Sequence, residues 1–216
     1  GSKVFPSPRY TPYHVPHRTE INGFMTILHG DARFYNNIFV QQPVRKLLTD
    51  YAKDKKTDRL DLMNYLVGTK PYDGYPDAEE YFAKFREDNY KIREERDKYY
   101  DHLPVYSGGN LYFNGAKPYN GESNYYEDTV NHIDLELAEK EDTLLLHTNL
   151  YHYMPAAGKE MISTALLGEA FEPEELFENP DGSPIIFDTD YSGKHRRPTP
   201  VSGPFELYDK VTEIPL

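Results

Sequence analysis

The sequence predicts a mainly β protein: terminal coils of a right-handed parallel β-helix, a helical insertion and a β-sandwich-like C-terminal region. Three observations carry this prediction. A strand-like run, "ARFYNNIFV" at residues 32–40, is split by two asparagines. A long amphipathic pattern occupies residues 77–102, and leucines alternate with polar residues within 132–151. We therefore divide the chain into β-helix coils with candidate active-site loops, a helical segment and a β-rich region, at residues 1–42, 43–103 and 104–216.

Composition bounds the class of protein. The 216 residues are only 38% hydrophobic, but 20 Tyr and 11 Phe supply enough bulk for a folded core. A net charge of -12 argues against nucleic-acid and anionic-membrane partners, because such a chain repels phosphate. There is no cysteine, no apolar run of membrane-spanning length and no signal-peptide pattern. Both the cytoplasm and secretion fit, and Gly1-Ser2 is either a tag remnant or the middle of a longer chain.

The adjacent residues Asn36 and Asn37 predict a corner between two short strands. Asparagine enters the left-handed backbone region at lower cost than other non-glycine residues, so it can turn the chain sharply. Corners of this kind join the sheets of a parallel β-helix, where stacked Asn side chains hydrogen-bond along the axis. A two-residue hairpin turn is the alternative. Because about three stacked coils are needed for stability and we find no further repeat after residue 42, we expect the other coils outside this sequence.

The remaining elements follow from periodicity and turn residues. Helical spacing appears in residues 43–67, and a clearer helix spans 77–102, where Asp77 can act as N-cap. The two Asn-Gly pairs in "NLYFNGAKPYNG" indicate a hairpin. A second hairpin is expected in "HIDLELAEKEDTLLLHTNLY", with one buried and one solvated face. The Pro-rich last twenty residues are expected to wrap the surface.

Two acidic residues near the corner, Glu20 and Asp31, could form a catalytic pair. Glycoside hydrolysis uses two carboxyl groups, one protonated as the acid and one ionised as nucleophile or base. Arg33 falls on the same side of a strand as Asp31 and could keep it ionised by charge pairing. The alternative is a surface Asp–Arg pair and a Glu in a loop.

Metal and cofactor motifs are weak. His14 and His17 could both reach an ion, but no third ligand has a recognisable spacing. A structural calcium site at Asp181, Asp188 and Asp190 is weighed against a plain turn, since the twelve-residue calcium-loop pattern is missing. No phosphate loop, nucleophile elbow or dinucleotide fingerprint occurs. We therefore expect no cofactor.

Two segments, "RYTPYHVPHRTEINGFMTILHGDARFYNNIFVQ" and "FENPDGSPIIFDTDYSG", resemble the C-terminal part of glycoside hydrolase family 120. The resemblance is most specific over residues 9–42. It implies a parallel β-helix with an added β-sandwich and a retaining exo-β-xylosidase that acts on short xylo-oligosaccharides in xylan degradation. By residue type and motif context, Asp31 is expected to be the nucleophile and Glu20 the acid/base. Substrate contacts are expected from Tyr13, His14, His17, His29 and Arg33.

The resemblance also implies that another part of the same enzyme, or a companion chain, completes the active site. An oligosaccharide is then the expected partner, and homo-oligomerisation is left open. Two other functions fit the sequence. One is a non-catalytic carbohydrate-binding or structural β module. The other is a polysaccharide lyase on a β-helix, which the acidic balance disfavours because uronate substrates are anionic.

Overall fold

The fold was analysed in a computed structural model of the chain. The structure describes residues 10–14, 19, 21–26, 30–41, 77–83, 103–118, 121–206 and 212–216. These residues form mainly strands with few helices, as predicted. The chain forms two compact units. Unit 1 comprises Gly1–Arg33, Tyr72–Tyr106 and Ser163–Ile186, and unit 2 comprises Phe34–Pro71, Ser107–Ile162 and Phe187–Leu216. The division at residues 42 and 103 stays a prediction.

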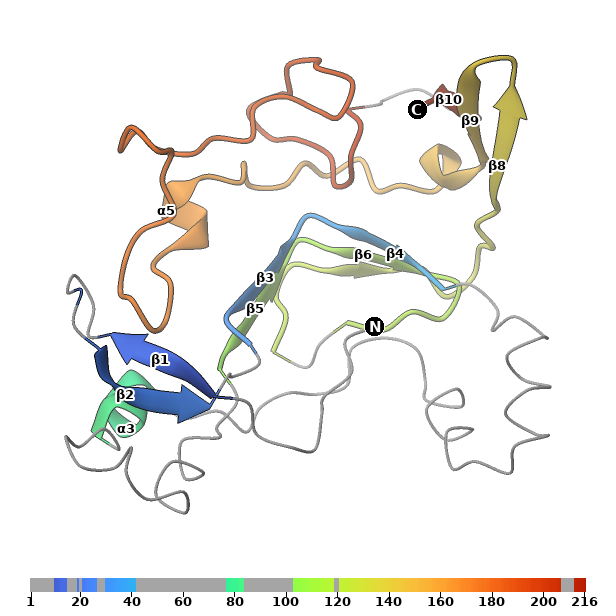
Figure 1. Cartoon of the computed structure of the whole chain (residues 1–216). Coiled ribbons are helices and arrows are strands. Elements are labelled where there is room, and N and C mark those ends of the chain that lie inside the picture. Colours follow the sequence, from blue (N-terminus) through green and yellow to red (C-terminus); the bar gives the residue numbers. More distant parts are fainter. Residues whose placement is uncertain are drawn as a thin grey trace, which may run out of the picture. The chain divides into compact units, whose positions relative to one another are not determined.

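The described residues of unit 1 form an antiparallel hairpin, two short helices and a run of isolated bridges. Strands β1 (Tyr10–His14) and β2 (Ile21–Thr26) pair with a register shift at Tyr13/His14 (Figure 1). Helix α3 (Ala78–Ala83) begins after Asp77, whose Oδ1 accepts the Glu80 N–H at 2.8 Å, so the predicted N-cap is confirmed. The rest of the predicted 77–102 helix and the 43–67 segment lie outside the described residues.

The third segment of unit 1 carries helix α5 (Thr164–Leu167), with Ser163 at its N-cap. It continues through bridges between Glu169 and Leu176 and between Glu178 and Pro184. Phe171 from this segment packs edge-on against the buried Tyr81 of α3, with ring centroids 5.3 Å apart. An aromatic contact therefore joins Tyr81 and Phe171, which lie 90 positions apart in the sequence.

The asparagine pair forms a corner, as predicted. Asn36 has φ 56°, in the left-handed region, and separates β3 (Ala32–Tyr35) from β4 (Ile38–Val40). The bend between the two strands is visible in Figure 1. A hairpin turn is excluded, because β3 pairs with β5 (Val105–Gly108) and β4 pairs with β6, so β3 and β4 are not partners.

The corner is repeated twice further along the chain, so the expectation of no repeat after residue 42 is wrong. Strands β4, β6 (Leu111–Phe113) and β7 (Tyr126–Glu127) pair in parallel, with Ile38 opposite Leu111 and Leu111 opposite Tyr126. Two residues before these positions lie Asn36, Gly109 and Asn124, with φ of 56°, 69° and 57°. Three left-handed corners are therefore in register.

Hydrogen bonds connect the corners of unit 2. The Asn37 side-chain amide donates to Asn110 Oδ1 at 3.1 Å, which is the amide ladder that the sequence predicts. The fully buried Asn110 donates in turn to Glu122 Oε1 at 2.7 Å and to the Phe34 carbonyl at 2.7 Å. Glu122 Oε2 accepts from Tyr112 Oη at 2.5 Å, and burial together with Glu122 raises the pKa of the Tyr112 phenol.

Apolar side chains close the interior of unit 2 beside this ladder. Leu111, Phe113, Ile133 and Leu150 form a buried cluster, and Phe39 stacks on Tyr112 with ring centroids 5.1 Å apart. The predicted Asn-Gly hairpin is wrong here. Asn114 and Gly115 do form a turn with positive φ, but it ends a strand whose partners are both parallel. The second Asn-Gly pair, at residues 120–121, is only partly described.

The second predicted hairpin is confirmed. Strands β8 (Leu135–Lys140) and β9 (Thr143–Thr148) are antiparallel, and β10 (Glu213–Pro215) adds to the other side of β9. The predicted buried face is only partly buried, since Leu135, Leu137 and Leu144 remain 39%, 62% and 42% exposed while Ile133 and Thr148 are buried. Leu145, on the opposite face, is buried. The β-sandwich-like arrangement stays a prediction.

Gly109 provides a test of the corner stack. A Cβ atom there would lie 2.3 Å from Asn36 Oδ1, whereas a Cβ at Gly115, also at positive φ, would meet nothing within 4 Å. We expect Gly109→Ala to lower the free energy of unfolding by about 1–3 kcal/mol more than Gly115→Ala, since overpacking adds to a shared backbone cost. Urea unfolding of both variants measures the difference, and equal losses would contradict the stack.

A second prediction concerns Asp190 in unit 2. Burial alone would raise the pKa of this carboxyl, but N–H donors from Glu206, Lys194 and Ser192, with the Ser192 hydroxyl, lower it to about 2. An acid whose pKa is lower when folded contributes stability above its unfolded pKa and loses it as pH falls. We expect Asp190→Asn to cost about 2 kcal/mol at pH 6.

That cost should shrink from pH 4 to pH 2, because protonation of the wild-type carboxyl removes the same stabilisation. Denaturant unfolding of both proteins across this range is the measurement. A difference in stability that does not change with pH would show that the ionised form of Asp190 is not what the turn requires.

Candidate active site

The carboxylate of Asp31 lies in unit 1 immediately before β3, where the sequence analysis placed a catalytic residue. Gly30 and Asp31 have φ of 127° and 50°, so the chain turns sharply as it enters the strand. Gly30 is required there, because a Cβ would lie 2.0 Å from the Leu103 carbonyl oxygen. The side chain of Asp31 retains 18% exposure.

Arg33 binds Asp31, as the spacing predicted. Its Nη1 donates to Asp31 Oδ1 at 2.5 Å and to the Asp31 carbonyl at 3.1 Å. The guanidinium also donates from Nε to the Leu167 carbonyl at 2.7 Å and from Nη2 to the Glu169 carbonyl at 2.5 Å. Arg33 therefore fastens the third segment of unit 1 to the start of β3.

Two aromatic rings enclose the same guanidinium. Its central carbon lies 4.6 Å from the ring centroid of Tyr106 and 4.5 Å from that of Phe177. A flat cation between two ring faces gains cation–π attraction and loses water. The Arg33 side chain is 7% exposed, and its contacts in the structure position Asp31. A contact between Arg33 and substrate stays a prediction.

The other predicted site residues are only partly described. Tyr13 and His14 lie on β1, and the His14 side chain is exposed. Glu20, His17 and His29 lie outside the described residues, so the pairing of Glu20 with Asp31 stays a prediction. In the part of the chain that the structure describes, no three His, Asp or Glu side chains are grouped as a metal ion would require.

The calcium-site carboxylates have other partners. Asp181 Oδ1 accepts the Ser183 N–H at 3.0 Å, and Asp190 accepts from its own turn and from Glu206. Asp188 lies 3.8 Å from His195 Nδ1. These contacts are those of turns, and a structural calcium ion stays a prediction.

The sequence reasoning missed a second carboxyl near Asp31. Phe171, 140 residues further along the chain, donates its N–H to Asp31 Oδ2 at 3.1 Å, and the next residue is Glu172. Burial, and secondarily the charge of Asp31, raise the pKa of Glu172. The acidic run around Glu172 contains no motif that marks this residue as functional. Only the fold brings its backbone next to Asp31.

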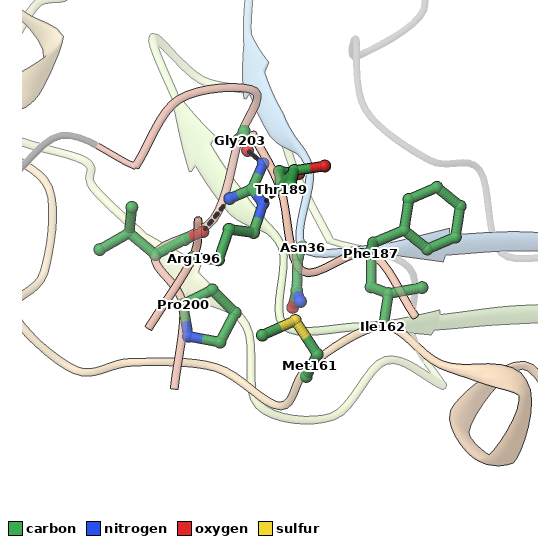
Figure 2. A pocket seen from close by; sticks show the side chains of 9 residues that line it. Asn36, Met161, Ile162, Phe187, Thr189, Arg196, Pro200 and Gly203 are labelled. Atoms are coloured by element: carbon green, nitrogen blue, oxygen red, sulfur yellow. Dashed lines mark hydrogen bonds between the residues drawn. The ribbon is translucent and has the colours of Figure 1, made fainter. Parts of the chain in front are cut away.

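Unit 2 has a small pocket of about 90 Å³, beside the Asn36 corner (Figure 2). Met161, Phe187 and Arg196 are among its lining residues. The Arg196 guanidinium in Figure 2 donates to the Gly203 and Val201 carbonyls, so its charge already has partners. Small-molecule sites typically begin at about 300 Å³, and we do not assign substrate binding to this pocket.

Comparisons with known proteins point to one solved structure. No family model matches the chain, and no curated protein matches it. The chain is similar to the structure described as the complex of XylC with xylose, with 28% sequence identity and a TM-score of 0.63. The similarity covers 96% of this chain and 29% of XylC, so this chain spans less than a third of the length of XylC. None of the described helices is long and apolar enough to cross a membrane.

The Arg33 contacts lead to a prediction about unit 1. Arg33→Lys keeps the charge but removes the planar set of donors, so we expect it to lower the free energy of unfolding by about 2–3 kcal/mol. Hydrogen exchange should accelerate in residues 163–186, which the guanidinium holds. Arg197→Lys, at a side chain of unit 2 that is 45% exposed, is the control and should leave hydrogen exchange in residues 163–186 unchanged. Equal rates of hydrogen exchange in residues 163–186 of both variants would contradict the role given to the Arg33 guanidinium.

Proposed function

We propose that this chain is part of a glycoside hydrolase that removes xylose from short xylo-oligosaccharides, a β-xylosidase of glycoside hydrolase family 120. The observation that carries the proposal is the similarity to XylC, solved with xylose, over 96% of the chain at 28% identity. The sequence resemblance to the same class of enzyme, made on residues 9–42, supports it independently of the backbone geometry.

The proposed scaffold is the terminal part of a right-handed parallel β-helix. Its support is the parallel pairing of β4, β6 and β7 with three left-handed corners in register. Coils stacked in this way hold loop residues at fixed spacing along one axis, which suits recognition of a chain of sugars. We propose that another part of the protein completes the site.

The proposed chemistry uses Asp31 as nucleophile and a second carboxyl group as acid/base, the role for which the sequence predicts Glu20. Asp31 Oδ1 accepts from the Arg33 guanidinium and Oδ2 accepts from the Phe171 N–H, so the carboxylate is held in a fixed orientation while its side chain stays 18% exposed, as a nucleophile requires. The acid/base would protonate the leaving oxygen and then activate water. Tyr13, His14, His17 and His29 are proposed to contact the sugar hydroxyl groups.

A non-catalytic carbohydrate-binding or structural module is the second candidate. The observation favouring it is that both Asp31 oxygens already have N–H partners, as in a purely structural ion pair. In that case the Asp31–Arg33 pair would only anchor the loop of residues 163–186.

Turnover of an aryl β-xyloside by the natural gene product distinguishes the two candidates. We expect Asp31→Asn to lower kcat by at least about 100-fold, because the nucleophilic charge is lost, and the same assay on Glu20→Gln tests the acid/base role that the sequence predicts for this residue. Asp134→Asn, at an exposed carboxyl of unit 2, is the control. EDTA should leave turnover unchanged. Full activity of both catalytic variants would favour the non-catalytic module.

A further inference from the structure

A tight loop in unit 1 presents a carboxyl group beside Asp31. The loop is closed by a bridge between Glu169 and Leu176 and by a hydrogen bond from the Ala170 N–H to the Glu175 carbonyl at 2.8 Å. Its tip holds Phe171, Glu172 and Pro173. Because Phe171 donates its N–H to Asp31 Oδ2, the backbone of the loop tip is fixed directly against the Asp31 carboxylate.

Rings on α3 hold the same loop tip from another side. Phe171 contacts Tyr81 edge-on and stacks on Phe82, with centroids 5.3 Å and 6.5 Å away. With the Arg33 bond to the Glu169 carbonyl, this gives the loop three separate attachments. Glu172 is therefore carried on a backbone whose position is determined on both sides, as a catalytic group requires.

The Glu172 side chain is half-buried and has no hydrogen bond or ion pair with any residue that the structure describes. Other buried carboxyl groups among the described residues differ from Glu172 in having partners. Glu122 accepts from Asn110 and Tyr112, and Glu206 accepts from Arg196 and Arg197. A partly buried carboxyl without such partners is costly as a charge, and this combination is characteristic of functional sites.

The surroundings of the loop raise the pKa of Glu172. Burial, and then the Asp31 charge, raise its pKa, and no cation is paired with it among the described residues. Arg33 instead pairs with Asp31. Among the described residues, the titratable and charged groups of the elements packed around the loop are Asp31, Arg33, Glu79, Glu80, Tyr81, Tyr106, Glu169, Glu174 and Glu175. The two carboxyl groups thus differ in their partners: Asp31 has an arginine and a backbone N–H, and Glu172 has neither among the described residues.

We propose that Glu172 is the proton donor that works with Asp31, in the role that the sequence assigned to Glu20. The inference rests on the proposed glycosidase function. An Asp31 oxygen attacks the anomeric carbon, the bond to the glycosidic oxygen breaks, and its electron pair takes the Glu172 proton. Water then gives a proton to the Glu172 carboxylate and attacks the anomeric carbon, which releases Asp31.

The test compares Glu172→Gln with Glu20→Gln and wild type in the natural gene product, on two substrates. Xylobiose has a poor leaving group that needs a proton, and dinitrophenyl β-xyloside has one that does not. We expect Glu172→Gln to lower kcat on xylobiose by about 10²- to 10⁴-fold and to change the first step on the dinitrophenyl substrate little. The alkaline limb of the pH profile should also disappear. Glu174→Gln, an exposed carboxyl in the same loop, is the matched control.

Azide separates lost chemistry from lost structure. With Glu172→Ala and the dinitrophenyl substrate, azide should restore turnover and yield xylosyl azide of retained configuration, which a misfolded protein cannot do. If wild type turns over xylobiose but Glu172→Gln does so equally well, or if azide rescues only the Glu20→Ala variant, the Glu172 assignment is overturned while the proposed function stands. If wild type hydrolyses neither xyloside, both are overturned.

Discussion

The described part of unit 2 depends on one constraint, the left-handed backbone at three corners in register. Asn36, Gly109 and Asn124 all have φ between 56° and 69°. The Asn36 N–H donates to the Gly108 carbonyl at 3.0 Å, and the Gly109 N–H donates to the Ser123 carbonyl at 3.3 Å. Backbone hydrogen bonds of this kind therefore join each corner to the next. A residue that could not adopt this conformation would break the parallel pairing on both sides of it.

The side chains at the corners turn this backbone constraint into a specific register. The Asn37 amide meets Asn110, and Asn110 meets Glu122, so a buried polar row runs beside the apolar cluster. Buried polar groups are stable only when their partners are present, and every displaced register would leave several of them unpaired. The middle corner is glycine, and a Cβ there would lie 2.3 Å from Asn36 Oδ1, so any other residue would require the Asn36 side chain to move.

Whether the sequence predicted a feature depended on how far apart in the sequence its interacting residues lie. Local chemistry was readable: the left-handed Asn36, the Asp77 cap, the β8–β9 turn and the Asp31–Arg33 pair all join residues within a few positions. The repeat of the corner could not be predicted from the sequence, since Asn37 and Asn110 are 73 residues apart and the second corner has a glycine where the first has Asn36.

Two errors share a cause in tertiary context. Alternating leucines on β8 and β9 suggested a buried face, but alternation only marks which side chains share a face, and nothing in it says what covers them. Asn114 and Gly115 adopt the predicted turn geometry, yet the strand before them already has two parallel partners. Glu172 was missed because its nearness to Asp31 depends on a contact across 140 residues.

The three-segment construction of unit 1 also bears on how the protein is made. Arg33 is synthesised 134 residues before Leu167, whose carbonyl it binds. The first segment and α3 must therefore exist without their final partners while the corners of unit 2 are still being translated. During this interval the nascent chain would expose rings that later pack against Phe171, such as that of Tyr81. Chaperones should therefore be needed during translation until residues 163–186 have emerged.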